Sequence, residues 1–182
     1  MSTRAMITFY KKPSDKLSQF EGGLFKNCDG YPSGTNGILN ILIPALFMYM
    51  KFRKKNDIGN AISTVTYFFK KQQFDMYKKW YDKNMGGMGE KEKGIPFSDS
   101  IYMEVAITGL EICKAKVFRD SLDFIYRIDL FKKQVKVYKV LRKAQGVQLV
   151  YTVPFNAEPV RGFTKNWLNI NCKSVDKFTF NR

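Results

Sequence analysis

The chain has 182 residues, of which 45% are hydrophobic, so it fits one globular domain and is too apolar for a disordered chain. It carries 31 Lys and Arg residues against 16 Asp and Glu residues, a net charge of +15, and it contains no histidine. The absence of histidine excludes Ser-His-Asp and Cys-His catalysis, and Cys28, Cys113 and Cys172 are too widely spaced for an ordinary zinc site. These cysteines are typical of free thiols in a reducing compartment, and we expect neither a metal nor a cofactor.

The first part of the chain predicts a β-hairpin followed by a central helix. Strands are expected at 3–10 and 19–27, on either side of turn-forming residues at 13–15. A helix should then run from about 37 to 55, and because it is apolar nearly all round it should be buried. Pro44 is expected to kink or split this helix.

A second helix is expected from Asp57, its capping residue, to about Asn84. Its apolar residues are spaced three and four apart and trace one face. Another face carries lysines and is expected to be solvated; they are Lys70, Lys71, Lys78 and Lys79.

Residues 85–99 contain four glycines and one proline and predict a mobile loop within a single domain spanning 1–182. A helical half, about 1–84, precedes this loop, and a strand-rich half, 100–182, follows it. The stretch 101–116 is ambiguous between strand and helix.

Three strands are predicted in the second half, at 122–130, 133–141 and 146–153, and their short connections predict an antiparallel meander. In the first strand, apolar residues alternate with three charged residues that should form a solvated face: Asp123, Arg127 and Asp129. In the second, the expected inward residues are Val135, Val137 and Leu141, and the expected outward residues are Lys136 and Tyr138.

These elements predict an α+β fold, a two-layer sandwich of an antiparallel sheet packed against two main helices, with the tail at 160–182 packing over a sheet edge. Residues 1–9 contain no apolar run of signal-peptide length, so we expect no secretion signal. The apolar stretch 37–50 is shorter than the ~18 residues of a spanning helix and predicts a core helix. Because basic residues follow it directly, a membrane-surface helix is an alternative.

One segment carries basic residues and no acidic residue. No Asp or Glu lies between Leu130 and Ala157, whereas cations and tyrosines do. Regularly spaced cations on a sheet can match a phosphate backbone, and outward aromatic rings can stack on unpaired bases. The candidate nucleic-acid-binding residues are Lys132, Lys133, Lys136, Tyr138, Lys139, Arg142 and Lys143. The alternatives are an edge strand protected by lysines against aggregation and a basic surface for an acidic protein partner.

A second signal is the glycine-rich turn at 29–37, just before the first helix. Glycines at a helix start can expose N–H groups to an anion, although this turn lacks the spacing of a known phosphate-binding motif. The candidate residues for a structural or anion-binding turn are Arg4, Asp29, Gly30, Tyr31 and Gly34. A turn that only caps the helix is the alternative.

The opening residues 2–5 (STRA) and the turn 29–34 (DGYPSG) are similar to a pattern in a family of uncharacterised bacteriophage and prophage proteins. That pattern has a short Thr-Arg strand and a D-G-Y-P-x-G turn before a helix, and the resemblance covers residues 1 to about 40. It implies a phage or mobile-element origin and an accessory role in the cytoplasm of a bacterial host, with association with the virion as a further option. It also suggests an ion pair between Arg4 and Asp29.

The carboxylates form no cluster of metal-ligand type, so the sequence favours a non-catalytic protein. The charge favours a small basic accessory protein that binds nucleic acid through a basic antiparallel sheet face. One alternative is a protein-interaction module that inhibits a host defence or replication complex through an acidic or nucleic-acid-binding partner. A further alternative is a virion or assembly component.

Overall fold

The computed structural model describes residues 3–27, 30–32, 37–52, 57–85, 110–113, 121–141, 146–156 and 175–177. The ranges 72–85 and 175–177 are described by their backbone alone. Of the predicted loop at 85–99, Met85 is the last residue of the second helix and 86–99 lie outside these residues, as does most of the ambiguous stretch 101–116.

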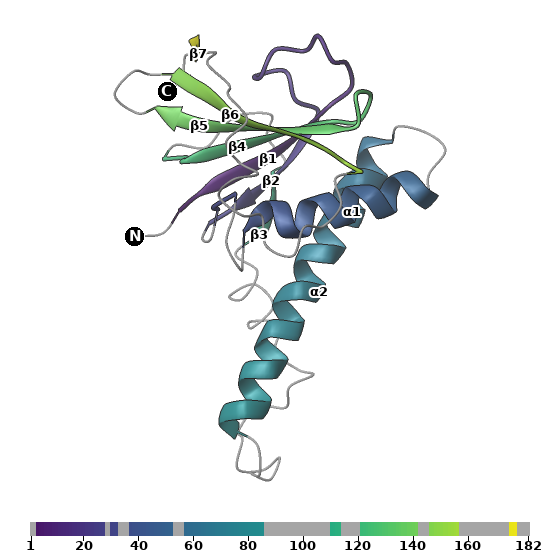
Figure 1. The fold of residues 1–182 in the computed structure, drawn as a ribbon, viewed down its shortest axis with the longest axis vertical. Helices are drawn as coiled ribbons and strands as arrows, with labels where there is room; N and C mark the ends of the chain where they lie inside the picture. Colours follow the sequence, from purple (N-terminus) through teal and green to yellow (C-terminus); the bar gives the residue numbers. More distant parts are fainter. Residues whose placement is uncertain are drawn as a thin grey trace.

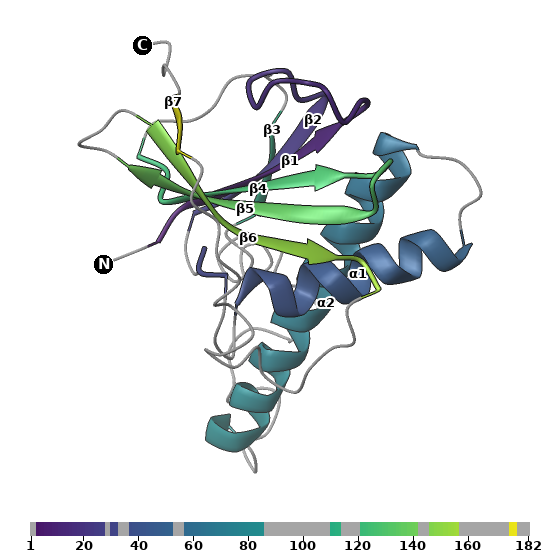
Figure 2. The same ribbon diagram turned by 45° about the horizontal axis from the view of Figure 1, so that its top comes forward.

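Within them, two helices pack on one face of a seven-stranded sheet (Figure 1, Figure 2), which confirms the predicted α+β class. The helices are α1 (Ile38–Phe52) and α2 (Ile58–Met85). The strands are β1 (Ala5–Tyr10), β2 (Gly22–Lys26), β3 (Leu110–Cys113), β4 (Phe124–Asp129), β5 (Gln134–Leu141), β6 (Gly146–Pro154) and β7 (Val175–Lys177). Their order across the sheet is β3-β2-β1-β4-β5-β6-β7.

The sheet is mixed, and this corrects the prediction of an antiparallel sheet. The β1–β2 hairpin and the β4-β5-β6 meander are antiparallel, as predicted. However, β1 pairs in parallel with β4, with Tyr10 opposite Asp129. A parallel pair requires a crossover connection, and here the chain passes through both helices on one face before it returns to the sheet. The three residues of β7 extend the sheet beyond β6, so this part of the predicted tail lies at an edge.

A β-bulge in β6 explains why its sequence does not alternate. Val137 pairs with Tyr151 and Tyr138 pairs with Leu149, so Val150 is the extra residue. Val150 and Tyr151 both pack against the core beneath the helices, whereas Leu149 packs on the opposite face. The bulge therefore moves the apolar residues of β6 from one face of the sheet to the other.

The two helices follow their predicted positions closely. Eight residues of α1 are buried, and the helix runs unbroken through Pro44, so the predicted split does not occur. The burial of these side chains offsets the cost of an interior proline, about 3 kcal/mol. Asp57 caps α2 as predicted, because its Oδ1 accepts the backbone N–H of Asn60 at 3.2 Å. The C-terminal part of α2 projects away from the sheet (Figure 1).

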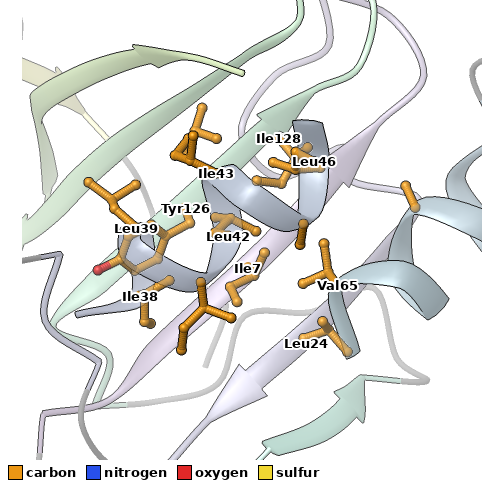
Figure 3. Packing of buried hydrophobic residues seen from close by; sticks show 14 of the residues in the cluster. Ile7, Leu24, Ile38, Leu39, Leu42, Ile43, Leu46, Val65, Tyr126 and Ile128 are labelled. Atoms are coloured by element: carbon orange, nitrogen blue, oxygen red, sulfur yellow. The ribbon is translucent and has the colours of Figure 1, made fainter. Parts of the chain in front are cut away.

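The sheet separates two hydrophobic cores. The larger one lies between the sheet and the helices, where Ile7 and Tyr126 meet Leu42 and Val65 (Figure 3). The second lies on the opposite face and includes Met6, Phe20, Phe25, Ile125 and Tyr138. Phe20 belongs to the connection at 11–21 between β1 and β2, so this connection helps to cover the second face.

The predicted solvated face of β4 is therefore wrong. Arg127 is 6% exposed and Asp129 is 3% exposed, because both lie on the second, covered face. Asp123 is half-buried, and its Oδ2 accepts the backbone N–H of Arg4 at 2.9 Å. Tyr138 points away from Val137 as predicted but is only 6% exposed, so it is a core residue. Of the cysteines, Cys113 lies half-buried in β3, whereas Cys28 and Cys172 lie outside the described residues.

Among the residues described above, no helix combines the length and the apolar character needed to cross a membrane.

Burial of two tyrosines predicts a loss of stability in alkali. Burial raises the pKa of Tyr10 and Tyr126 above the ordinary value of about 10, and for Tyr10 the nearby Arg127 opposes this rise only in part. Tyrosines in the unfolded chain ionise near pH 10, while the two buried ones stay protonated. Their contribution to the free energy of unfolding is therefore fully present below pH 10 and is lost as the pH rises above it. We expect the free energy of unfolding, measured by urea titration, to fall from pH 8 to about pH 11. Tyr10→Phe should reduce that fall by about 1 kcal/mol. An equal fall in both proteins would contradict this assignment.

Candidate nucleic-acid interface

The turn between β4 and β5 presents two exposed lysines on a fixed backbone. Lys132 and Lys133 are exposed. The carboxylate of Asp129 accepts the backbone N–H of Lys132 at 2.9 Å, and the carbonyl of Lys133 accepts the N–H of Phe155 at 2.9 Å. Lys133 has a φ of 53°, in the left-handed region, where a residue other than glycine costs roughly 1–2 kcal/mol. A lysine thus stands where glycine would suit the backbone better.

The connection at 11–21 lies at the same end of the sheet. Because β1 and β4 run in parallel with Tyr10 opposite Asp129, the connection after β1 and the turn after β4 begin side by side. Figure 1 and Figure 2 both show them at one end of the strands. The connection carries three exposed lysines: Lys11, Lys12 and Lys16.

Buried Arg127 fixes this connection against the sheet. Its guanidinium donates hydrogen bonds to the carbonyl of Asp15 at 2.6 Å and to that of Pro13 at 2.9 Å. It also lies 4.1 Å from the centroid of the Tyr10 ring, a cation–π contact. Tyr10 in turn donates its hydroxyl hydrogen bond to the carbonyl of Leu17. A buried side chain therefore helps to hold the connection that carries these lysines, in addition to the contacts that the lysines make themselves.

The cations at this end outnumber the carboxylates that lie among them. Glu21 lies 3.6 Å from Lys11 in an ion pair, so Lys11 is compensated. Asp15 accepts the backbone N–H of Lys12 at 2.9 Å, and Asp129 is buried in its turn. Among the described residues, Arg127 meets carbonyl groups and an aromatic ring rather than a carboxylate, so its charge is retained. We call the exposed or half-exposed lysines here the basic end: Lys12, Lys16, Lys132, Lys133 and Lys136.

The structure divides the predicted nucleic-acid-binding residues. Lys136 pairs with Arg127 and lies on the second face, whereas Lys139 pairs with Phe124 and lies on the helix face. Residues three apart on a strand point to opposite faces, so these two lysines do not share one sheet surface. Tyr138 is buried and its ring is closed to bases. Arg142 and Lys143 lie outside the described residues.

Sequence reasoning missed Lys12, Lys16 and Phe131. The two lysines join the site through the parallel pairing of β1 with β4, which local patterns do not reveal. Phe131 is 68% exposed in the turn beside Lys132. The predicted strands at 122–130 and 133–141 left Phe131 in the loop between them, and a large apolar residue in such a short turn is the signal that was available.

The glycine-rich turn has a structural role at the residues described. Gly30 donates its N–H to the carbonyl of Thr3 at 2.9 Å and accepts the hydroxyl of Tyr126 at 2.8 Å. The N–H of Ile38, at the start of α1, is bonded to the carbonyl of Tyr31 at 2.8 Å, so it is occupied and closed to an anion.

Other residues of this turn prediction are placed only in part. Arg4 is exposed, and its backbone bonds to Asp123. The ring of Tyr31 is 50% exposed. Asp29 and Gly34 lie outside the described residues, and so does the predicted ion pair between Arg4 and Asp29.

Within the described ranges, no three acidic or cysteine residues group as a metal site would require.

Gly30 is predicted to tolerate no side chain. A Cβ there would lie 2.8 Å from the Cβ of Ala5 and 2.9 Å from the carbonyl oxygen of Thr3, and neither atom can rotate away. We expect Gly30→Ala to lower the free energy of unfolding by roughly 1–3 kcal/mol in urea titrations. Gly22→Ala is the control, because its Cβ would meet only the flexible ends of Ile62 and Ile58. Equal effects of the two changes would contradict the close approach at Gly30.

Arg127→Lys is predicted to release the 11–21 connection while keeping the charge. Lysine lacks the planar fork that binds two carbonyls, so we expect a loss of about 2 kcal/mol of stability and faster tryptic cleavage after Lys11 or Lys16. Arg4→Lys makes the same change at an exposed side chain and should alter neither quantity. Unchanged cleavage in Arg127→Lys would show that other contacts hold the connection.

Comparisons of the chain with protein-family models, with curated proteins and with solved structures found no match, so the resemblance to phage proteins remains a prediction.

Proposed function

We propose that the protein is a small, non-catalytic accessory protein that binds nucleic acid through its basic end. The observation that carries this proposal is the convergence of lysines from two separate segments, 11–21 and 130–136, at one end of the sheet. The lysines of a backbone-tracking site neutralise phosphates and release counterions, and this electrostatic effect supplies most of the affinity of non-specific binding. The phage-type origin is part of the proposal and rests on the resemblance of residues 2–5 and 29–34.

The backbone at the basic end supports a binding role. Lysines on flexible loops lose conformational entropy when they bind, whereas these lysines stand on a backbone that is already fixed. The bond from Lys132 to Asp129 fixes the turn, and the bonds from Arg127 fix the connection. Lys133 keeps a left-handed backbone at an energetic cost, as residues at functional sites often do.

Retained positive charge behind the lysines supports the same role. Arg127 is buried and Lys136 is its neighbour on β5, so the two cations lie side by side on one face. Burial in a medium of low dielectric constant strengthens the field of a charge, and among the described residues Arg127 contacts carbonyls and an aromatic ring rather than a carboxylate. An anionic polymer at this end would lower the repulsion between them.

Removing three charges from the basic end tests the proposal. We expect Lys132→Gln, Lys133→Gln and Lys136→Gln together to weaken binding of a labelled oligonucleotide and to make the slope of log affinity on log salt shallower by about 2 to 3. Fluorescence polarisation at about 50 and 200 mM salt measures both quantities.

The matched control removes the same charge elsewhere. Lys51→Gln, Lys71→Gln and Lys139→Gln change three exposed lysines outside the basic end. This variant should bind nearly as the native chain does. Equal weakening in both triple variants would show that total charge rather than the basic end determines binding, and no binding by the native chain at low salt would refute the proposed function.

A further inference from the structure

Phe131 is exposed at the tip of the β4–β5 turn, beside the lysines of the basic end. Its side chain is 68% exposed, the largest exposed fraction among the large hydrophobic residues of the described ranges. The preceding residue, Leu130, is only 3% exposed and anchors the turn in the helix-side core. The turn therefore obtains its apolar anchor from Leu130, and the fold gains little from the ring of Phe131.

The turn holds the backbone that carries this ring in a defined position. The bond from the Lys132 N–H to Asp129 and the bond from the Phe155 N–H to Lys133 fix the backbone on the side that follows the ring. An aromatic side chain has only two torsions to order, so little conformational entropy is lost when it binds. Two cations follow it directly in the chain, at Lys132 and Lys133.

We propose that Phe131 is a stacking platform for an unpaired base, with Lys132 and Lys133 contacting the flanking phosphates. The basic end then takes single-stranded nucleic acid in preference to a duplex. An aromatic ring beside cations matches the repeating unit of a single strand, a π-face next to a phosphate. In a duplex each base is already stacked between its neighbours and offers no such face. This inference rests on the proposed function and adds the class of nucleic acid.

The experiment compares a single strand of about 12 nucleotides with a duplex of the same length, by polarisation at one low salt concentration. Phe131→Ala should weaken single-strand binding roughly 5- to 150-fold and leave duplex binding nearly unchanged. The salt slope should stay the same, because no charge is removed. The unfolding midpoint should also hold, because the side chain is exposed.

Two further variants separate stacking from simple hydrophobic contact. Phe131→Leu keeps an apolar side chain without a π-face and should bind as weakly as Phe131→Ala. Phe131→Trp should bind at least as tightly as the native chain, and its fluorescence should be quenched by the single strand more strongly than that of the native chain.

The outcomes distinguish this inference from the proposed function. If the native chain binds nucleic acid and Phe131→Ala binds the single strand equally well, only the stacking role is overturned. The same holds if Phe131→Leu matches the native chain, or if Phe131→Ala loses single-strand and duplex binding alike. If the native chain binds neither polymer, the proposed function fails and the stacking role fails with it.

Discussion

The parallel pairing of β1 with β4 determines where the other parts of the molecule lie. β1 is buried along all six of its residues and lies next to β2 and β4 near the middle of the sheet. Because β1 and β4 point the same way, the segments that follow them emerge at the same end. An antiparallel arrangement of this pair would have placed the 11–21 connection and the 130–133 turn at opposite ends, about 20 Å apart for strands of this length. The basic end exists because of this one pairing.

Buried Arg127 then fixes the 11–21 connection against the sheet, beside the β4–β5 turn. Arg127 lies on β4 opposite Thr8 of β1, within the parallel pair itself. Burying a guanidinium is expensive unless its donors are satisfied, and here two carbonyls of the 11–21 connection satisfy part of them. A carboxylate partner would have neutralised the charge. Carbonyl partners hold the connection against the sheet without placing a carboxylate on the guanidinium, as the proposed anionic partner would require.

Local patterns in the sequence predicted the elements but not their long-range relations. The period-two alternation of β4 and β5, the spacing of apolar residues in α2 as far as Phe69 and the cap at Asp57 all depend on neighbouring residues, and all were confirmed. The strand alternation also identified Arg127 and Asp129 as lying on one face. It could not reveal that a segment more than 100 residues away in the chain covers that face. The structure shows this through the hydrogen bond from Arg127 to the carbonyl of Asp15.

The candidate site was predicted in part for the same reason. The acid-free run from 130 to 157 located Lys132, Lys133 and Lys136. Lys12 and Lys16 were missed because only the parallel pair brings them near. Lys136 and Lys139 are three residues apart, so the period of a strand already places them on opposite faces. The sequence therefore did not support grouping them on one surface.

The β4–β5 turn shows most clearly where the fold and the proposed function have different requirements. Asp129 bonds to the turn as an Asx residue does, and Leu130 is buried, so both follow the rules for a stable hairpin. Phe131 and Lys133 depart from those rules, one by exposing a ring and the other by adopting a left-handed backbone. Asn or Gly at 133 and a polar residue at 131 would suit the turn better. Departures from local preference within an otherwise regular element are expected where binding constrains the residues, and here both departures lie beside the same cations. The fold alone gives no reason for either residue, whereas the proposed single strand, with a base on the ring and a phosphate on each lysine, would account for both.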